Sequence, residues 1–112
     1  MSINNAGKMD NAFATVTAGS TDTAVVAAVA GKKIRVHAAV FQCGGTATTA
    51  VFNTKPAGSG TAISMTFSNG ANGGAVLPES EFGWFETGSG EGLSLTTGAG
   101  SSTGVHVIYS EV

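Results

Sequence analysis

Residues 33–43 read KIRVHAAVFQC, and this stretch carries the clearest secondary-structure pattern in the chain. Apolar side chains occupy every second position, at Ile34, Val36, Ala38 and Val40. Alternation with a period of two is the pattern of a β-strand that turns one face to a core. Two glycines follow directly and end the strand. The stretch therefore predicts a half-buried strand with these four side chains facing inward.

Similar short stretches recur along the chain and are separated by turns rich in Gly, Ser and Asn. Further strands are expected at residues 12–18, 23–29, 46–53, 63–68, 75–77, 93–96 and 105–112, and one more around the aromatic residues that follow Pro78. Strands spaced about every 10–12 residues are typical of sandwiches and barrels. Parallel strands need a long crossover connection, usually a helix, and the sequence contains no long segment with a helical period that could provide one. We expect an all-β fold, an antiparallel two-sheet sandwich of jelly-roll type with about eight strands.

The domain organisation follows from the same pattern. Residues 1–11 are polar and have no periodicity, so we interpret them as a flexible N-terminal arm. Residues 12–112 then form a single β-sandwich domain. Gly, Ala, Thr and Ser make up more than half of the chain, so its core contains few large side chains. A thin core in a chain of 112 residues favours a protein that gains stability from an assembly.

Charge excludes some partners. The chain has 5 Lys and Arg against 7 Asp and Glu, which argues against nucleic-acid binding. It contains no apolar run long enough to span a membrane. All the basic residues precede residue 56, and most of the acidic ones follow residue 78. This asymmetry is either incidental surface charge or a dipolar surface that orients subunits in an assembly.

Candidate catalytic and metal-binding residues are few. His37 and His106 both lie on expected strands, opposite the presumed core face, and have no ligand cluster around them. Cys43 cannot form an intrachain disulfide and has no nucleophile signature. Glu79 and Glu81 could form a glycosidase pair, but a solvated acidic loop is the simpler reading. We therefore expect no enzyme activity, no cofactor, no metal and no catalytic residue.

One concentrated aromatic feature lies at Phe82, Trp84 and Phe85, around Gly83. Aromatic side chains bury large areas and are enriched at interfaces. The expected role of this cluster is the centre of the thin core or a contact between subunits. The alternative is a platform on which a sugar stacks.

Three segments together resemble a known pattern. These are NGGAVLP at residues 72–78, GWFET at residues 83–87 and GEGLSL at residues 90–95, followed by GVHVIYSEV at the end of the chain. The combination resembles small head decoration, or cement, proteins of tailed bacteriophages, which have a jelly-roll domain. The resemblance covers about residues 24–112. It implies a homotrimer that clamps the outer capsid where major capsid protein subunits meet.

Under this hypothesis the chain is a structural virion protein, made in the host cytoplasm, that stabilises the head and contacts neither nucleic acid nor membrane. The arm and four basic residues are candidates for capsid contact, namely Lys8, Lys32, Lys33 and Arg35. The candidates for core or trimer packing are Phe82, Trp84, Phe85 and Tyr109. The alternative function is a phage tail or fibre-associated β-sandwich module that binds cell-surface carbohydrate.

Overall fold

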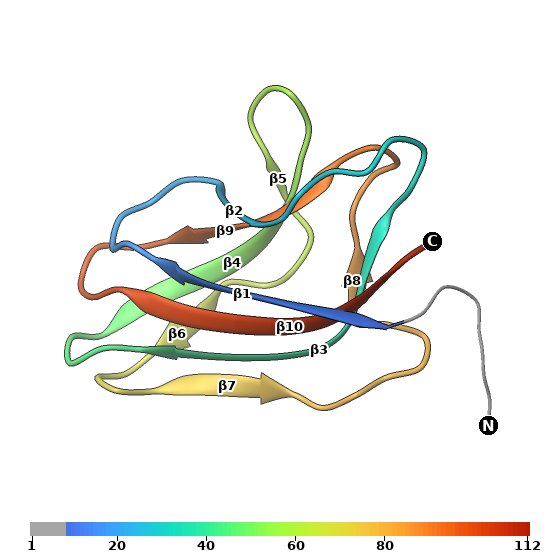
Figure 1. Ribbon diagram of the computed structural model, residues 1–112. Coiled ribbons are helices and arrows are strands. Elements are labelled where there is room, and N and C mark those ends of the chain that lie inside the picture. Colours follow the sequence, from blue (N-terminus) through green and yellow to red (C-terminus); the bar gives the residue numbers. More distant parts are fainter. Residues whose placement is uncertain (1–8) are drawn as a thin grey trace.

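A computed structural model describes residues 9–112 and confirms the all-β class. These residues form ten strands in two antiparallel sheets that pack as a sandwich, and none of them is helical (Figure 1). The strands are β1 (Asp10–Val16), β2 (Thr23–Val26), β3 (Ile34–Cys43), β4 (Thr48–Lys55), β5 (Thr61–Ala62), β6 (Phe67–Asn69), β7 (Gly74–Leu77), β8 (Phe85–Glu86), β9 (Gly92–Thr97) and β10 (Thr103–Glu111).

The two sheets have matching strand orders. The first sheet runs β1–β10–β3–β7. The short β8 pairs with a different stretch of β3 from the one that pairs with β7. The second sheet runs β2–β9–β4–β5, and β6 pairs with β4 beside β5. The chain alternates between the sheets from β1 to β4, and again from β8 through β9 to β10. This order is consistent with a jelly roll.

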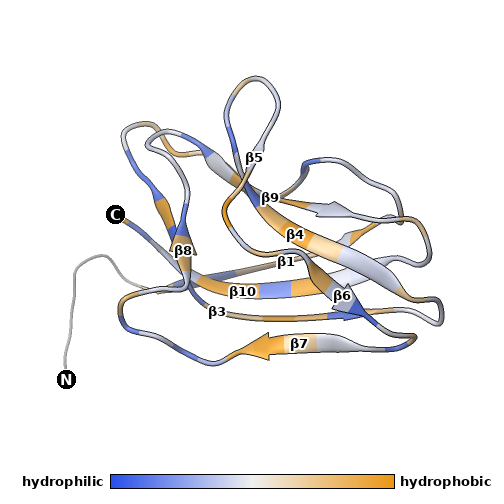
Figure 2. Ribbon diagram, turned by 180° about the vertical axis from the view of Figure 1, so that it is seen from behind, coloured by the Kyte–Doolittle hydropathy of each residue, from blue (hydrophilic) through white to orange (hydrophobic). Residues whose placement is uncertain are grey.

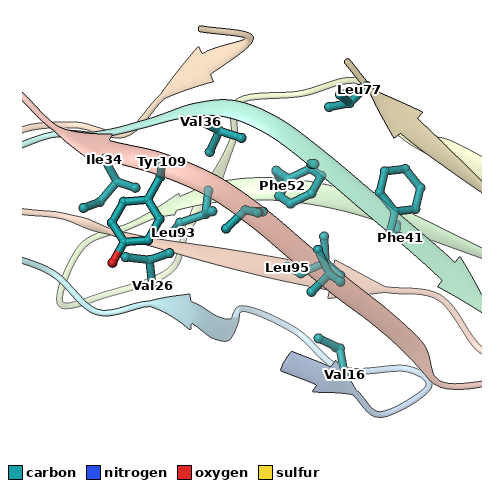
Figure 3. Close-up of a cluster of buried hydrophobic side chains, with 14 residues drawn as sticks. Val16, Val26, Ile34, Val36, Phe41, Phe52, Leu77, Leu93, Leu95 and Tyr109 are labelled. Carbon is teal, nitrogen blue, oxygen red and sulfur yellow. The ribbon is translucent and has the colours of Figure 1, made fainter. Parts of the chain in front are cut away.

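The core lies between the sheets, and Figure 3 shows its buried side chains, among them Phe41 and Phe52. Two partly buried phenylalanines, Phe67 and Phe85, pack against these two. The ring centroids of Phe41 on β3 and Phe67 on β6 are 4.8 Å apart, in an edge-to-face arrangement. Phe52 on β4 lies between Phe41, at 6.0 Å, and Phe85, at 5.0 Å. Branched aliphatic residues and Ala50 fill the remaining space. Because most other side chains are small, these few rings supply a large part of the buried apolar area.

A β-bulge in β3 overturns part of the predicted pattern. Ile108 pairs with Ala38, but the next residue, Tyr109, pairs with Val36, so His37 is an extra residue on β3. An unpaired residue shifts the alternation of side chains by one position. Ile34 and Val36 are buried as predicted, but beyond the bulge the inward positions are Ala39, Phe41 and Cys43. The prediction that Ala38 and Val40 face inward is wrong, and Val40 is 46% exposed.

Two further expectations need correction. The predicted strand 63–68 is interrupted, since β5 ends at Ala62 and β6 begins at Phe67. Met65, expected inward, is exposed because it lies in the connection between them. The expectation that the arm extends to residue 11 is also wrong, because Asp10 and Asn11 already pair with Tyr109 and Ile108 in β1. Residues 1–8, including Lys8, lie outside the described part of the chain.

We predict that Gly74→Ala strongly destabilises the fold. Gly74 opposes Gln42 on β3, and a Cβ at Gly74 would overlap the Phe41 backbone carbonyl oxygen. Such an overlap forces a backbone shift that costs about 1–3 kcal/mol of unfolding free energy. Gly104 faces Gln42 from the opposite side, where a Cβ would meet nothing.

The matched control is therefore Gly104→Ala, which should be neutral or raise the unfolding free energy by up to about 1 kcal/mol. Urea denaturation of both variants measures the difference. Equal stabilities would contradict the close approach of β7 to β3.

Candidate interaction surfaces

The two histidines have separate roles in the structure. Within residues 9–112, no three side chains of His, Cys, Asp or Glu come together in a way that could hold a metal ion. His106 projects outward from β10, as expected from its sequence position, and is exposed. His37 differs from the expectation, because it is buried.

His37 has a structural explanation for its burial. Its Nδ1 lies 2.8 Å from the Ser80 carbonyl oxygen, and its Nε2 lies 2.8 Å from the Ser110 hydroxyl. A carbonyl oxygen only accepts hydrogen bonds, so Nδ1 carries the donated proton, and in the neutral ring Nε2 accepts from Ser110. The backbone N–H of Ser80 also donates to the His37 carbonyl. The bulged residue thus holds the β7–β8 loop, residues 78–84, against β3.

The candidate basic residues Lys32, Lys33 and Arg35 lie together, in the β2–β3 turn and at the start of β3. Arg35 and Lys33 pair with Glu86 on β8, at 2.9 and 3.3 Å. Figure 2 shows hydrophilic residues gathered around β8. Because β8 pairs directly with the start of β3, the acidic Glu86 from the second half of the chain meets the basic Lys33 and Arg35 from the first. At this end the structure mixes the two signs and forms no separate basic and acidic faces.

Glu86 is the acid with the clearest electrostatic effect. The hydrogen bond from the Arg35 guanidinium lowers the pKa of the Glu86 carboxyl below its usual value of 4.5. The bond from Lys33 and the positive charges of both side chains lower this pKa further, while partial burial opposes them. Lys33, Arg35 and Glu86 side chains are each about a third to a half exposed. A partner could therefore contact these three side chains, whose opposite charges partly cancel. Lys32, next to Lys33 in the chain, is exposed.

The predicted aromatic cluster divides into two environments. Phe85 packs against the core and Tyr109 is buried. Both lie opposite Val36 of β3 in the sheet, Phe85 on β8 and Tyr109 on β10. Burial raises the pKa of the Tyr109 hydroxyl, and the nearby carboxylates of Asp10 and Glu111 add to this effect.

Of the two roles expected for Phe82 and Trp84, the centre of the core is wrong, because they are 86% and 46% exposed. Their role in a contact between subunits stays a prediction. Gly83 has a φ of 86°, so the chain turns between these two residues and reaches strand geometry only at Phe85. The Trp84 backbone N–H donates to the Val36 carbonyl, and its indole N–H donates to the Pro78 carbonyl. These bonds hold the indole at the surface of the β7–β8 loop.

An apolar face that the sequence reasoning missed covers the outside of the first sheet. Phe13 pairs with His106, His106 with Val40, and Val40 with Val76, which makes one row across all four strands. Phe13 is 75% exposed and Val76 is 68% exposed. The sequence did contain a signal for this face. Residues 38–41 are apolar at both odd and even positions, which indicates a strand with apolar side chains on both of its faces.

Beside this row lies a shallow apolar hollow of about 390 Å³. Ala38, Val40, Val76, Pro78, His106 and Ile108 line most of it. Glu79 at the edge is the one charged residue that contributes to its lining. We call the row and this hollow the apolar face.

The outside of the second sheet contrasts with the apolar face, because polar groups there satisfy one another. The Asp22 carboxylate accepts hydrogen bonds from the Asn53 amide, at 3.0 Å, and from the Gly60 backbone N–H, at 2.9 Å. Asn53 also donates to the Thr96 hydroxyl, at 2.6 Å. This network closes the β1–β2 and β4–β5 loops over the sheet. The two outer faces of the sandwich are therefore chemically different.

No protein-family model, curated protein sequence or solved structure matches the chain. Within residues 9–112 there is no helix with the length and apolar character of a membrane span. What the described surfaces offer is an apolar face, a mixed-charge group around Glu86 and two exposed aromatic side chains in one loop.

We predict a pH-dependent contribution of Glu86 to stability. Because its pKa is lowered in the folded state, this contribution is present above about pH 4.5 and is lost as the pH falls through the lowered value. At pH 7, Glu86→Gln should reduce the unfolding free energy by less than about 1 kcal/mol, since the pairs are half exposed.

Denaturant unfolding of both proteins between neutral and acid pH measures this contribution. The two stabilities should converge as the pH falls, and Arg35→Met should weaken the pH dependence in the same way. A difference between wild type and Glu86→Gln that stays constant down to low pH would refute the assignment.

Proposed function

We propose that this chain is a structural virion protein, a phage head decoration or cement protein that binds the outer capsid as a trimer and stabilises the shell. The observation that carries the proposal is the apolar face of the first sheet. An exposed apolar surface of a few hundred Å², rimmed by polar groups, is often a functional interaction surface. The sequence resemblance described above supplies the kind of assembly.

The relative positions of the capsid-contact candidates support the proposal. Arg35 pairs with Ser110 on β10, and Asp10 on β1 pairs with the adjacent Tyr109. Lys33 exchanges two backbone hydrogen bonds with Val112, so the end of the chain lies beside the basic turn. The start of β1 therefore lies at the same end of the sandwich as Lys32, Lys33 and Arg35 (Figure 1). One contact with a capsid could engage all of them.

Many weak contacts of this kind can stabilise a shell. Each bound copy adds a modest free energy, and a repeated lattice multiplies it through multivalency. Binding that favours the mature shell over its disassembled subunits stabilises the shell by linkage. A low-charge sandwich with short loops suits this role, and it requires no reacting group.

The test is electron microscopy of the virions of the phage that encodes the chain. We expect density for the protein on the outer head, and we expect Lys32→Glu combined with Lys33→Glu to lower its occupancy. Lys55→Glu is the matched control, because Lys55 turns to the Pro56 and Gly58 carbonyls of its own loop. Density on the tail, or a protein missing from the particles, would overturn the proposal.

A second candidate function rests on the exposure of Phe82 and Trp84. An exposed, fixed indole is a surface on which a sugar ring can stack, as in a carbohydrate-binding module of a phage tail or fibre. A glycan array with the wild-type chain tests this function, and Trp84→Ala should abolish any binding. Val76→Ala, which alters an exposed apolar side chain on the apolar face, is the control. An array without bound glycans would remove this candidate.

A further inference from the structure

We propose that the apolar face joins copies of this chain, with Phe13 of one copy seated in the hollow of another. The inference deepens the oligomeric part of the proposed function by assigning the surface through which the subunits meet. It rests on a protruding side chain, a complementary hollow and the absence of charge between them.

The protruding element is Phe13, in the middle of the edge strand β1. Its ring lies against the His106 imidazole, with 5.5 Å between the ring centroids and a tilt of 50°. The His106 Nε2 lies 3.4 Å from the Asn11 side-chain oxygen. One side of the phenyl ring is thus supported within the chain, while three quarters of the residue remains exposed. Burying such a side chain against another molecule is favourable, because it removes apolar surface from water.

The receiving element is the hollow at the β3–β7 side of the same face. Its lining is almost entirely apolar, and the small side chain of Ala38 leaves room between Val76 and Ile108. An apolar cavity of about 150 Å³ is enough to hold benzene. The hollow, at about 390 Å³, therefore has space for a phenyl ring.

Charge favours a second copy as the occupant. Across the row and the hollow, the outward positions carry Asn, Thr, Gln, Gly and apolar residues together with His106, and Glu79 lies at the rim. The charged outward residue of β3 is Arg35, which lies beyond the bulge and pairs with Glu86. A chain of net charge −2 meets a copy of itself here without opposing like charges. Phe13 on β1 lies next to the hollow, which residues of β10, β3 and β7 line, so one face carries both the protruding ring and the site that can receive it.

The size of the face sets the strength of the contact. Four strands about 4.8 Å apart and about seven residues long, at about 3.3 Å each, present roughly 450 Å². A standard interface contributes about 800 Å² per partner, so we expect weak, readily reversible association. If each of two copies inserts its Phe13 into the other, a two-fold dimer results, whereas one insertion per neighbour can close a ring of three.

Sedimentation velocity of the purified chain over a range of concentrations tests the contact. We expect wild type to associate into two or three chains of 11.0 kDa. Phe13→Ser, which removes the inserted ring, and Ala38→Leu, which fills the hollow, should each weaken association at least tenfold. Phe82→Ser is the matched control, since Phe82 is a phenylalanine off the apolar face that is even more exposed than Phe13, and it should leave association unchanged.

A photo-crosslinking benzoylphenylalanine at position 13 locates the contact directly. We expect crosslinks from this position to the Val76–Pro78 region of another chain. Wild type that stays monomeric at the highest concentration, or association lost in Phe82→Ser and kept in Phe13→Ser, would overturn the inference. Crosslinks confined within one chain would do the same.

The outcome is separable from that of the proposed function, because these measurements use the purified chain alone. A protein absent from virions that still associates through Phe13 overturns only the capsid proposal. A dimer supports the inference and contradicts the trimer. A capsid-bound protein whose Phe13→Ser variant associates normally overturns only the inference.

Discussion

The bulge at His37 is the constraint on which the rest of the structure depends. It shifts the side-chain alternation of the central strand β3, so that Phe41 enters the core and Val40 faces outward. It also marks where β3 changes its edge partner from β7 to β8, and the buried imidazole holds the loop between them. The core contacts of Phe41 and the exposed row through Val40 both follow from this one extra residue.

The two outer faces of the sandwich then differ because their strands carry different partners. Over the second sheet, Asp22 reaches Asn53 and Gly60 and closes two loops with internal hydrogen bonds. Over the first sheet, Phe13, Val40 and Val76 align in register, and all three are exposed among the described residues. A thin core and an uncovered apolar face point in the same direction, toward a protein whose full burial of apolar surface is reached in an assembly.

Sequence reasoning succeeded where a strand has a single apolar face. Val105, Val107 and Tyr109 alternate without interruption, and all three are buried as the pattern predicts. It failed where the local pattern was ambiguous. Residues 38–41 are all apolar, so nothing local shows which of them faces inward after His37. Phe82 and Trp84 resembled core residues by type, but a turn at Gly83 keeps them in an exposed loop.

By itself, the sequence determined the all-β class, the antiparallel sandwich and most strand positions, because period-two alternation and Gly-rich turns are local signals. Only the tertiary structure decided which residues share a surface. Phe13, His106, Val40 and Val76 come from four strands far apart along the chain, and Lys33 and Arg35 meet Glu86 from the other half. Such groupings depend on strand order and register, which arise from the packing of the whole chain and leave no trace in any one segment.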